Sequence, residues 1–123
     1  MVKSEIEKDT RFAVCGTAVR CGKDVAVTIC GGSAHIGAVA LAVYEPERDS
    51  ATVSTITVYT HRDDIIAYTL AKKISKRLHC TVTVTVGLHL DNANAEEIDQ
   101  LTENSLRCSD VLLQKLQEEN TGY

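Results

Sequence analysis

The segment Thr81-Val82-Thr83-Val84-Thr85-Val86 decides the fold, because it alternates strictly between a hydroxyl-bearing and an apolar side chain. Successive side chains of a β-strand point to opposite faces of a sheet. The three valines are therefore expected to meet a buried core, and the three threonines to lie on the other face. The segments on both sides of this strand have a different period, which predicts helices that cover the valine face.

Residues 63–78, before this strand, have the pattern of an amphipathic helix. Apolar side chains recur every four residues, and basic side chains occupy other positions around the helix. The recurring apolar residues are Ile66, Leu70, Ile74 and Leu78. After the strand, Asn94 and Glu97 have the spacing of a capping box, so a second helix is predicted to begin there. Residues 118–123 are polar and are expected to fray.

Four further strands are predicted before the first helix. Residues 11–20 and 25–30 are rich in β-forming residues around a short polar turn, which predicts a hairpin. Residues 36–44 are apolar at nearly every position, as in a strand covered on both faces, and residues 52–59 are mostly β-branched. The order ββββαβα predicts an α+β fold: a mainly antiparallel five-stranded sheet with both helices on one face.

Composition limits the class of protein. The 123 residues suit one domain, with an ordered core expected over about residues 10–118. The 13 basic and 17 acidic residues leave a net charge of −4, and aromatic residues are scarce, so a nucleic-acid partner is not expected. Residues 1–11 are charged and polar without a signal-peptide core, and no apolar run suits a membrane span. We therefore expect a cytoplasmic protein with no membrane contact.

The five cysteines suggest neither a disulfide framework nor a zinc site, because their number is odd and no C-x-x-C motif occurs. They are Cys15, Cys21, Cys30, Cys80 and Cys108. We expect them to be small buried or half-buried hydrophobic residues.

The sheet face opposite the helices is expected to be small and semi-polar. Its predicted residues are Thr81, Thr83 and Thr85, with Cys15, Thr17 and Thr28 beside them. Because residues 36–44 are apolar on both faces, we expect a homodimer that forms across this face or along a sheet edge.

Polar residues are predicted to converge at one end of this sheet. Antiparallel pairing of strands 36–44 and 52–59 brings His35 and His61 together, and a fifth strand parallel to the fourth adds His89. Both helices begin there, and helix N-termini and glycine turns present N–H groups that suit an anion such as phosphate. The candidate residues are Gly31, Gly32, Ser33, His35, His61, Arg62, His89, Asp91 and Asn92.

Two strings resemble the patterns of the prenylated-flavin chaperone family, which is typified by the small D subunit of bacterial gallate decarboxylase. Residues 31–40, GGSAHIGAVA, resemble G-G-x-x-H-[IF]-G-A. Residues 87–98, GLHLDNANAEEI, resemble G-[ILM]-H-[VL]-D-N-x-[ST]-x-E-E-[IL]. One departure is Asn94, where the pattern has Ser or Thr, and asparagine caps a helix equally well. The order of elements matches over roughly residues 10–118.

The resemblance implies a non-catalytic, homo-oligomeric protein that binds prenylated flavin mononucleotide and helps to deliver or mature it in a UbiD-type decarboxylase. It implies a ligand loop of Gly31, Gly32, His35 and Gly37, with His89, Asp91 and Asn92 as its neighbours. A flavin also needs a flat wall. The aromatic residues in the body of the domain are Phe12, Tyr44, Tyr59 and Tyr68. With so few of them, we expect a shared or loosely held ligand.

Other functions remain open from the sequence. A small metal-dependent enzyme would use three imidazoles and a carboxylate, here His35, His61, His89 and Asp91, although their spacing matches no known metal motif. A ligand-free assembly module would dock a partner on the sheet face, since the order of elements is similar to proteasome-assembly-chaperone-like folds. Cys30 would act as a nucleophile only in an environment that lowers its pKa.

Overall fold

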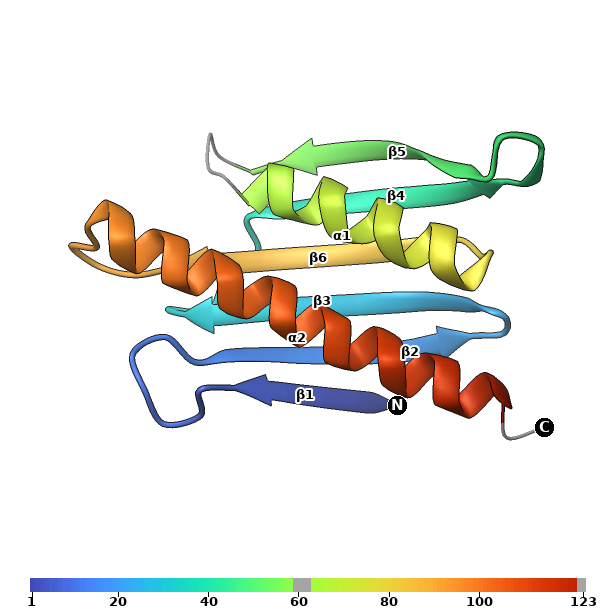
Figure 1. The fold of residues 1–123 in the computed structure, drawn as a ribbon. Coiled ribbons are helices and arrows are strands. Elements are labelled where there is room, and N and C mark those ends of the chain that lie inside the picture. Colours follow the sequence, from blue (N-terminus) through green and yellow to red (C-terminus); the bar gives the residue numbers. More distant parts are fainter. Residues whose placement is uncertain (59–62, 122–123) are drawn as a thin grey trace.

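Two helices lie across one face of a β-sheet (Figure 1). The structure is a computed structural model that describes residues 1–58 and 63–121. Within these residues the strands are β1 (Val2–Ile6), β2 (Val14–Cys21), β3 (Asp24–Gly32), β4 (Ala38–Glu45), β5 (Ser50–Thr57) and β6 (Val82–His89). The helices are α1 (Asp63–Leu78) and α2 (Ala95–Thr121), and a 3-10 turn, η1 (Pro46–Arg48), joins β4 to β5.

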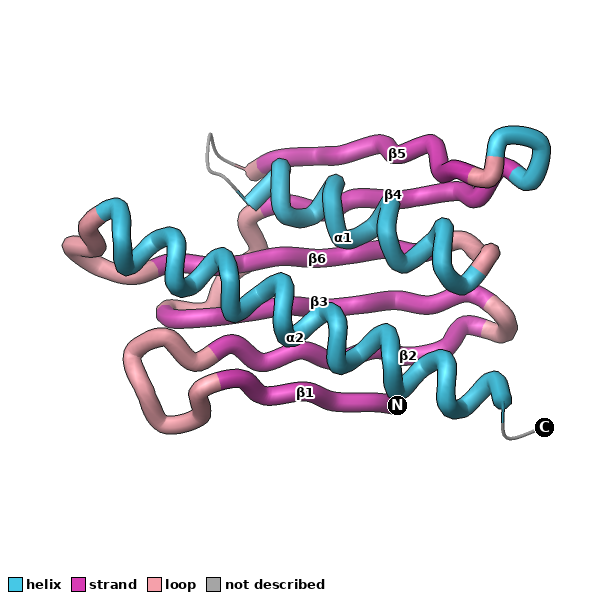
Figure 2. Tube along the Cα trace, viewed as in Figure 1, coloured by secondary structure: helices cyan, strands magenta, loops and turns pink. Residues whose placement is uncertain are grey.

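The strands form one sheet in the order β1-β2-β3-β6-β4-β5. Only the β3–β6 pair among the described strands is parallel, and the other neighbours are antiparallel. Helix α1 packs over β4, β5 and β6, whereas α2 crosses β1, β2 and β3 (Figure 2). The predicted α+β class, with a mainly antiparallel sheet and both helices on one face, is confirmed.

The predicted number of strands is wrong, because β1 adds a sixth strand within residues 1–11. Ser4 and Ile6 point inward and are buried, whereas Lys3 and Glu5 remain in water. Helix α2 supports this edge: the Lys115 ammonium donates a hydrogen bond of 2.6 Å to the backbone oxygen of Lys3. Charged outward residues are typical of an edge strand, and Lys3 and Glu5 lie on such an edge.

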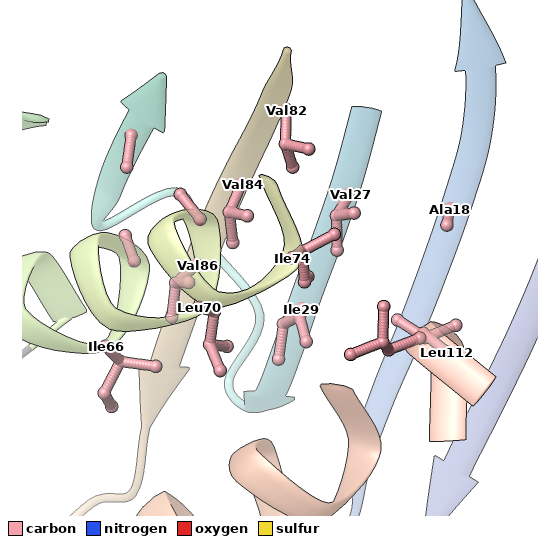
Figure 3. Close-up of a cluster of buried hydrophobic side chains, with 14 of the residues drawn as sticks. Ala18, Val27, Ile29, Ile66, Leu70, Ile74, Val82, Val84, Val86 and Leu112 are labelled. Carbon is pink, nitrogen blue, oxygen red and sulfur yellow. The ribbon is translucent and has the colours of Figure 1, made fainter. Parts of the chain in front are cut away.

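The valine face of β6 forms the centre of the core, as the alternation predicts. Val82, Val84 and Val86 are fully buried, and the threonines between them are half-buried on the opposite face. Figure 3 shows these valines beneath Ile66, Leu70 and Ile74 of α1, with Val27 and Ile29 of β3 alongside.

None of the helices in residues 1–58 and 63–121 is long and apolar enough to cross a membrane.

Helix α2 begins at the predicted capping box but extends further than predicted. The Asn94 side-chain oxygen accepts a hydrogen bond of 2.8 Å from the Glu97 backbone amide. The Glu97 carboxylate in turn accepts one of 3.1 Å from the Asn94 backbone amide. The helix continues beyond residue 118, where the sequence predicts a frayed tail, and its last residue is Thr121. Arg20 of β2 contacts the C-terminal part of α2. Its guanidinium donates a hydrogen bond of 3.1 Å to the Leu116 backbone oxygen and forms an ion pair of 3.6 Å with Glu119.

The sheet face opposite the helices, here called the open face, is uncovered in the single chain. On β4, Ala38, Ala40 and Ala42 are buried under α1, but Leu41 and Val43 on the open face are 43% and 46% exposed. Within one chain this strand is therefore covered on one face, and the subunit interface expected on its other face stays a prediction. The predicted small residues Cys15, Thr17 and Thr28 also lie on the open face.

Candidate functional site

The two motif strings meet at the end of the sheet where β3 and β6 finish and β4 begins, here called the rim. Gly32 is the register partner of His89 in the parallel β3–β6 pair. The Ser33 amide donates to the His89 backbone oxygen at 2.9 Å, and the Gly37 amide donates to Val86 at 2.9 Å. The loop of residues 33–37 thus folds over the end of β6 and carries His35 to His89.

Glycine is required where this loop and the strand end come into contact. A Cβ on Gly32, whose φ is +67°, would overlap the His89 carbonyl oxygen. A Cβ on Gly87 would overlap the carbonyl oxygen of His35, and one on Gly37 would overlap the Asp63 carboxylate. Real Cβ atoms do not approach so closely. These three motif glycines therefore hold the loop against β6 and α1.

The imidazole rings of His35 and His89 lie edge to face, with centroids 6.0 Å apart and planes at 85°. His35 Nδ1 lies 3.1 Å from the Ser33 backbone oxygen, so this nitrogen carries a hydrogen. His89 Nε2 carries a hydrogen toward Asp91 Oδ1, 2.9 Å away. The side chains of His35 and His89 are 40% and 47% exposed. The rim therefore presents two oriented and accessible rings.

Asp63 belongs to the rim, although the sequence suggests only a helix-start charge for it. It is the first residue of α1, it is 3% exposed, and its Oδ2 atom lies 3.8 Å from His35 Nε2. A carboxylate is stabilised at a helix N-terminus by the helix dipole. The adjacent Asp64 is only half-buried. Sequence alone does not tell the two acids apart, because the orientation of α1 decides which one faces the loop.

Arg11 is a second rim-associated residue that the sequence does not reveal. It donates to the Asp91 backbone oxygen at 3.0 Å and forms an ion pair with Glu97, also at 3.0 Å. These contacts fix the loop between β6 and α2. In this loop, Asp91 has an 80% exposed side chain, and Asn92 is exposed with φ at +55°.

The backbone groups proposed for phosphate binding are largely used within the protein. The Ser33 and Gly37 amides have backbone partners, as described above. Asp63 and Asp64 occupy the first turn of α1, and Asn94 with Glu97 caps α2. These carboxylates disfavour a phosphate at either helix N-terminus. His61 and Arg62, also predicted for the site, lie outside the described residues.

A shallow hollow of 280 Å³ adjoins the rim. Its lining residues are Glu5, Thr10, Arg11, Ala13, Val14, Cys15, Cys30, Gly31, Gly32 and Ala34. Pockets for drug-sized ligands measure about 300–1,000 Å³, so this hollow suits only part of a flavin mononucleotide. Tyr44 does not extend it, because its ring stacks on His79 at 4.3 Å at the opposite end of the sheet.

The cysteines differ from the sequence expectation. Cys80 and Cys108 are buried and Cys30 is half-buried, but Cys15 and Cys21 are exposed, so for these two the expectation is wrong. Burial raises the pKa of the Cys30 thiol, and its neighbours Cys15 and Asp63 raise the pKa further. A raised pKa leaves the Cys30 thiol without the activation that a catalytic nucleophile needs.

A metal centre has no support in the part of the chain that the structure describes. Within residues 1–58 and 63–121, no three His, Cys, Asp or Glu side chains are grouped as a metal ion requires. His61, one of the four residues considered for such a centre, lies outside this part. His35, His89 and Asp91 share the rim without forming a metal-binding group.

Comparisons with known proteins agree with the fold. Residues 8–117 match the profile of a family described as "Prenylated flavin chaperone LpdD-like domain". No curated protein sequence matches the chain significantly. A similar solved structure is described as "Crystal Structure of a Novel Chaperone Complex for Yeast 20S Proteasome Assembly". Its TM-score is 0.59 at 18% identity, over 97% of this chain and 98% of that chain, and this likeness shows the fold alone.

Proposed function

The chain belongs to the family of LpdD-like prenylated flavin chaperone domains, and on that premise we propose that it is a cytoplasmic, non-catalytic accessory protein that binds prenylated flavin mononucleotide. It delivers this cofactor to a UbiD-type decarboxylase, its client. The observation that carries the proposal is the meeting of both family motif strings at one rim, where the His35 and His89 rings lie 6.0 Å apart.

The chemistry of the rim suits a flavin ligand. A flavin has a flat ring system with polar edges, and its mononucleotide carries an anionic phosphate. His35 and His89 offer exposed imidazole faces and nitrogens. The wall of the adjoining hollow contains small residues such as Gly31 and Ala34, together with the charged residues Glu5 and Arg11. Asp91 orients the His89 imidazole through a hydrogen bond of 2.9 Å, and the Asp63 carboxylate lies 3.8 Å from His35 Nε2. Asn92 adds an exposed polar side chain beside them.

The openness of this site supports a carrier role. The hollow encloses too little volume for a whole flavin mononucleotide, and Tyr44 lies at the other end of the sheet, where it stacks on His79 and not on His35 or His89. A protein that hands its ligand on must release it, so a partly exposed site is favourable. We include in the proposal a homodimer, in which a second copy docks on the open face.

Flavin titration tests the binding. The purified protein is titrated under anaerobic conditions with flavin mononucleotide and with its reduced prenylated form, while flavin absorbance and fluorescence are recorded. We expect saturable binding of the prenylated form. Replacing both imidazoles, in a His35→Asn and His89→Asn double variant, should weaken binding about 10- to 100-fold, as expected for two lost hydrogen bonds.

A matched control is available at the other end of the sheet. His79 is exposed and stacks on Tyr44, so His79→Asn makes the same chemical change away from the rim. This variant should bind flavin as the wild type does, and circular dichroism checks that all variants fold. If neither flavin binds below millimolar concentration, or if the double variant binds like the wild type, the proposed ligand is wrong.

Delivery is tested separately. Flavin-loaded protein is mixed with an apo decarboxylase of the UbiD type, and decarboxylation is compared with that obtained from the same amount of free cofactor. More active enzyme with the loaded protein supports delivery. Equal activity would leave a flavin-binding protein without a delivery role.

A further inference from the structure

Cys15 and Cys30 lie directly opposite each other on neighbouring strands. They are register partners in the antiparallel β2–β3 pair, and both belong to the open face. Both are free thiols; Cys15 is exposed and Cys30 is half-buried. They also line the hollow beside the rim, where Cys30 directly precedes Gly31 and Gly32. Two accessible thiols therefore share one wall of this hollow.

Strand geometry brings this pair within reach of a covalent bond. Directly opposed residues of an antiparallel pair have Cα atoms about 4.5–5.5 Å apart, and disulfides span about 4.4–6.8 Å between Cα atoms. Their Cβ atoms lie about 4.5–5.5 Å apart, slightly more than a disulfide prefers. A bond between them therefore requires a small local approach of the strands. Strained or exposed disulfides are the readily reduced ones, so this bond would be reversible.

We propose that Cys15 and Cys30 are an oxidation site at which a peroxide forms an intramolecular disulfide that thiols can reduce again. The exposed Cys15 sulfur first attacks hydrogen peroxide, which breaks the O–O bond, gives a sulfenic acid and releases one water after proton transfer. The Cys30 thiol then gives up its proton as its sulfur attacks the Cys15 sulfur. The S–S bond forms, the S–O bond breaks, and the sulfenic oxygen leaves as a second water. Overall, two thiols lose two electrons and two protons, and the peroxide is reduced to two waters.

The other cysteines lack this arrangement. Cys21 is exposed on the same face of β2, but its register partner is Asp24. Cys80 and Cys108 are buried. Because Cys15 is exposed and Cys30 is half-buried, a peroxide in solution reaches the Cys15 sulfur first.

The disulfide would change the site beside it. It would tie β2 to the residue directly before Gly31 and replace two separate thiols in the wall of the hollow by one S–S group. This chemistry does not require any particular ligand at the rim.

Peptide mapping of the oxidised protein tests the proposal. The protein is treated with a small excess of hydrogen peroxide, blocked with N-ethylmaleimide and digested with trypsin without reduction. The basic residues around the three cysteines place Cys15 in peptide 12–20, Cys21 in peptide 21–23 and Cys30 in peptide 24–48. We expect two of the five thiols to be lost, peptides 12–20 and 24–48 to be linked, and dithiothreitol to restore both thiols.

Three variants serve as controls. Cys15→Ser and Cys30→Ser should each abolish the linked peptides, whereas Cys21→Ser should form them like the wild type. Non-reducing electrophoresis distinguishes a bond within one chain from a bond between copies. Oxidation of Cys21 as fast as that of Cys15, a disulfide between two chains, or sulfinic acid at Cys15 without a link would each overturn the proposal.

Discussion

At the scale of the residue, the rim depends on glycine as much as on histidine. His35 reaches His89 because its backbone passes directly over Gly87, where no side chain is present. Gly37, at the end of the same loop, has no side chain and so leaves room for the buried carboxylate of Asp63. In this chain these glycines therefore have a steric role, because the position of His35 depends on them.

Adding one methyl group at this contact tests the reasoning. Gly87→Ala should lower the free energy of unfolding by about 1–3 kcal/mol, because the new Cβ displaces the His35 backbone. Flavin affinity should fall as well, since the loop moves away from His89. Chemical denaturation and flavin titration measure the two effects.

A control glycine lies in the turn between β2 and β3. Gly22 has φ at +63°, and no neighbouring atom lies within 4 Å of the point that a Cβ would occupy there. Asparagine tolerates this left-handed conformation. Gly22→Asn should therefore change stability little and leave flavin affinity intact. If Gly87→Ala is as stable as Gly22→Asn, the close contact is not as tight as the structure indicates.

At the scale of the element, the start of α2 connects a capping box to the rim. Asn94 and Glu97 satisfy each other's amides, and Glu97 also pairs with Arg11. Arg11 in turn donates to the Asp91 backbone. One helix start thus holds the loop between β1 and β2 against the loop that follows β6.

The cap is tested with two substitutions at one position. Asn94→Ala removes the acceptor for the Glu97 amide and should lower the free energy of unfolding by about 1 kcal/mol. Asn94→Ser keeps a capping oxygen, as the family pattern does, and should retain wild-type stability. Denaturant titration of both variants decides the matter: equal stability of the two would show that the cap contributes nothing measurable.

At the scale of the whole molecule, the open face has apolar side chains on its β4–β5 half. Leu41, Val43 and Ile56 are 43%, 46% and 76% exposed, and Val39 lies beside Ile56 in the register. The oxidation site proposed above lies on the other half, on β2 and β3. A second copy docked on the β4–β5 half would cover apolar surface, which favours association.

The oligomeric state follows from this surface. We expect the wild type to sediment as a dimer, and Leu41→Lys with Val43→Lys to sediment as a monomer, because two charges cannot be buried without partners. Leu106→Lys is the control, since Leu106 is 39% exposed on α2, away from the open face. A monomeric wild type, or a charged double variant that stays dimeric, contradicts the proposed interface.

Local pattern was sufficient to predict most of the elements. The alternation at residues 81–86 predicts a strand with a valine face, and the four-residue period predicts a helix at 63–78 that the structure confirms. The capping box predicts where α2 begins. Each of these features depends only on residues a few positions apart in the chain, so the sequence is sufficient to predict them.

The tertiary structure decided what depends on distant partners. β1 forms because α2, which is distant in sequence, covers its inner side chains. The segment itself is charged and has no clear local period, so it gives no sign that a helix covers it. The burial of Asp63, the contact of Arg11 with Asp91 and the pairing of Cys15 with Cys30 likewise require strand register and helix placement. The sequence by itself determined the end of the sheet to which the motifs belong and all elements but β1, because both follow from local period and chain direction. Which side chains meet there was decided only when the layers packed.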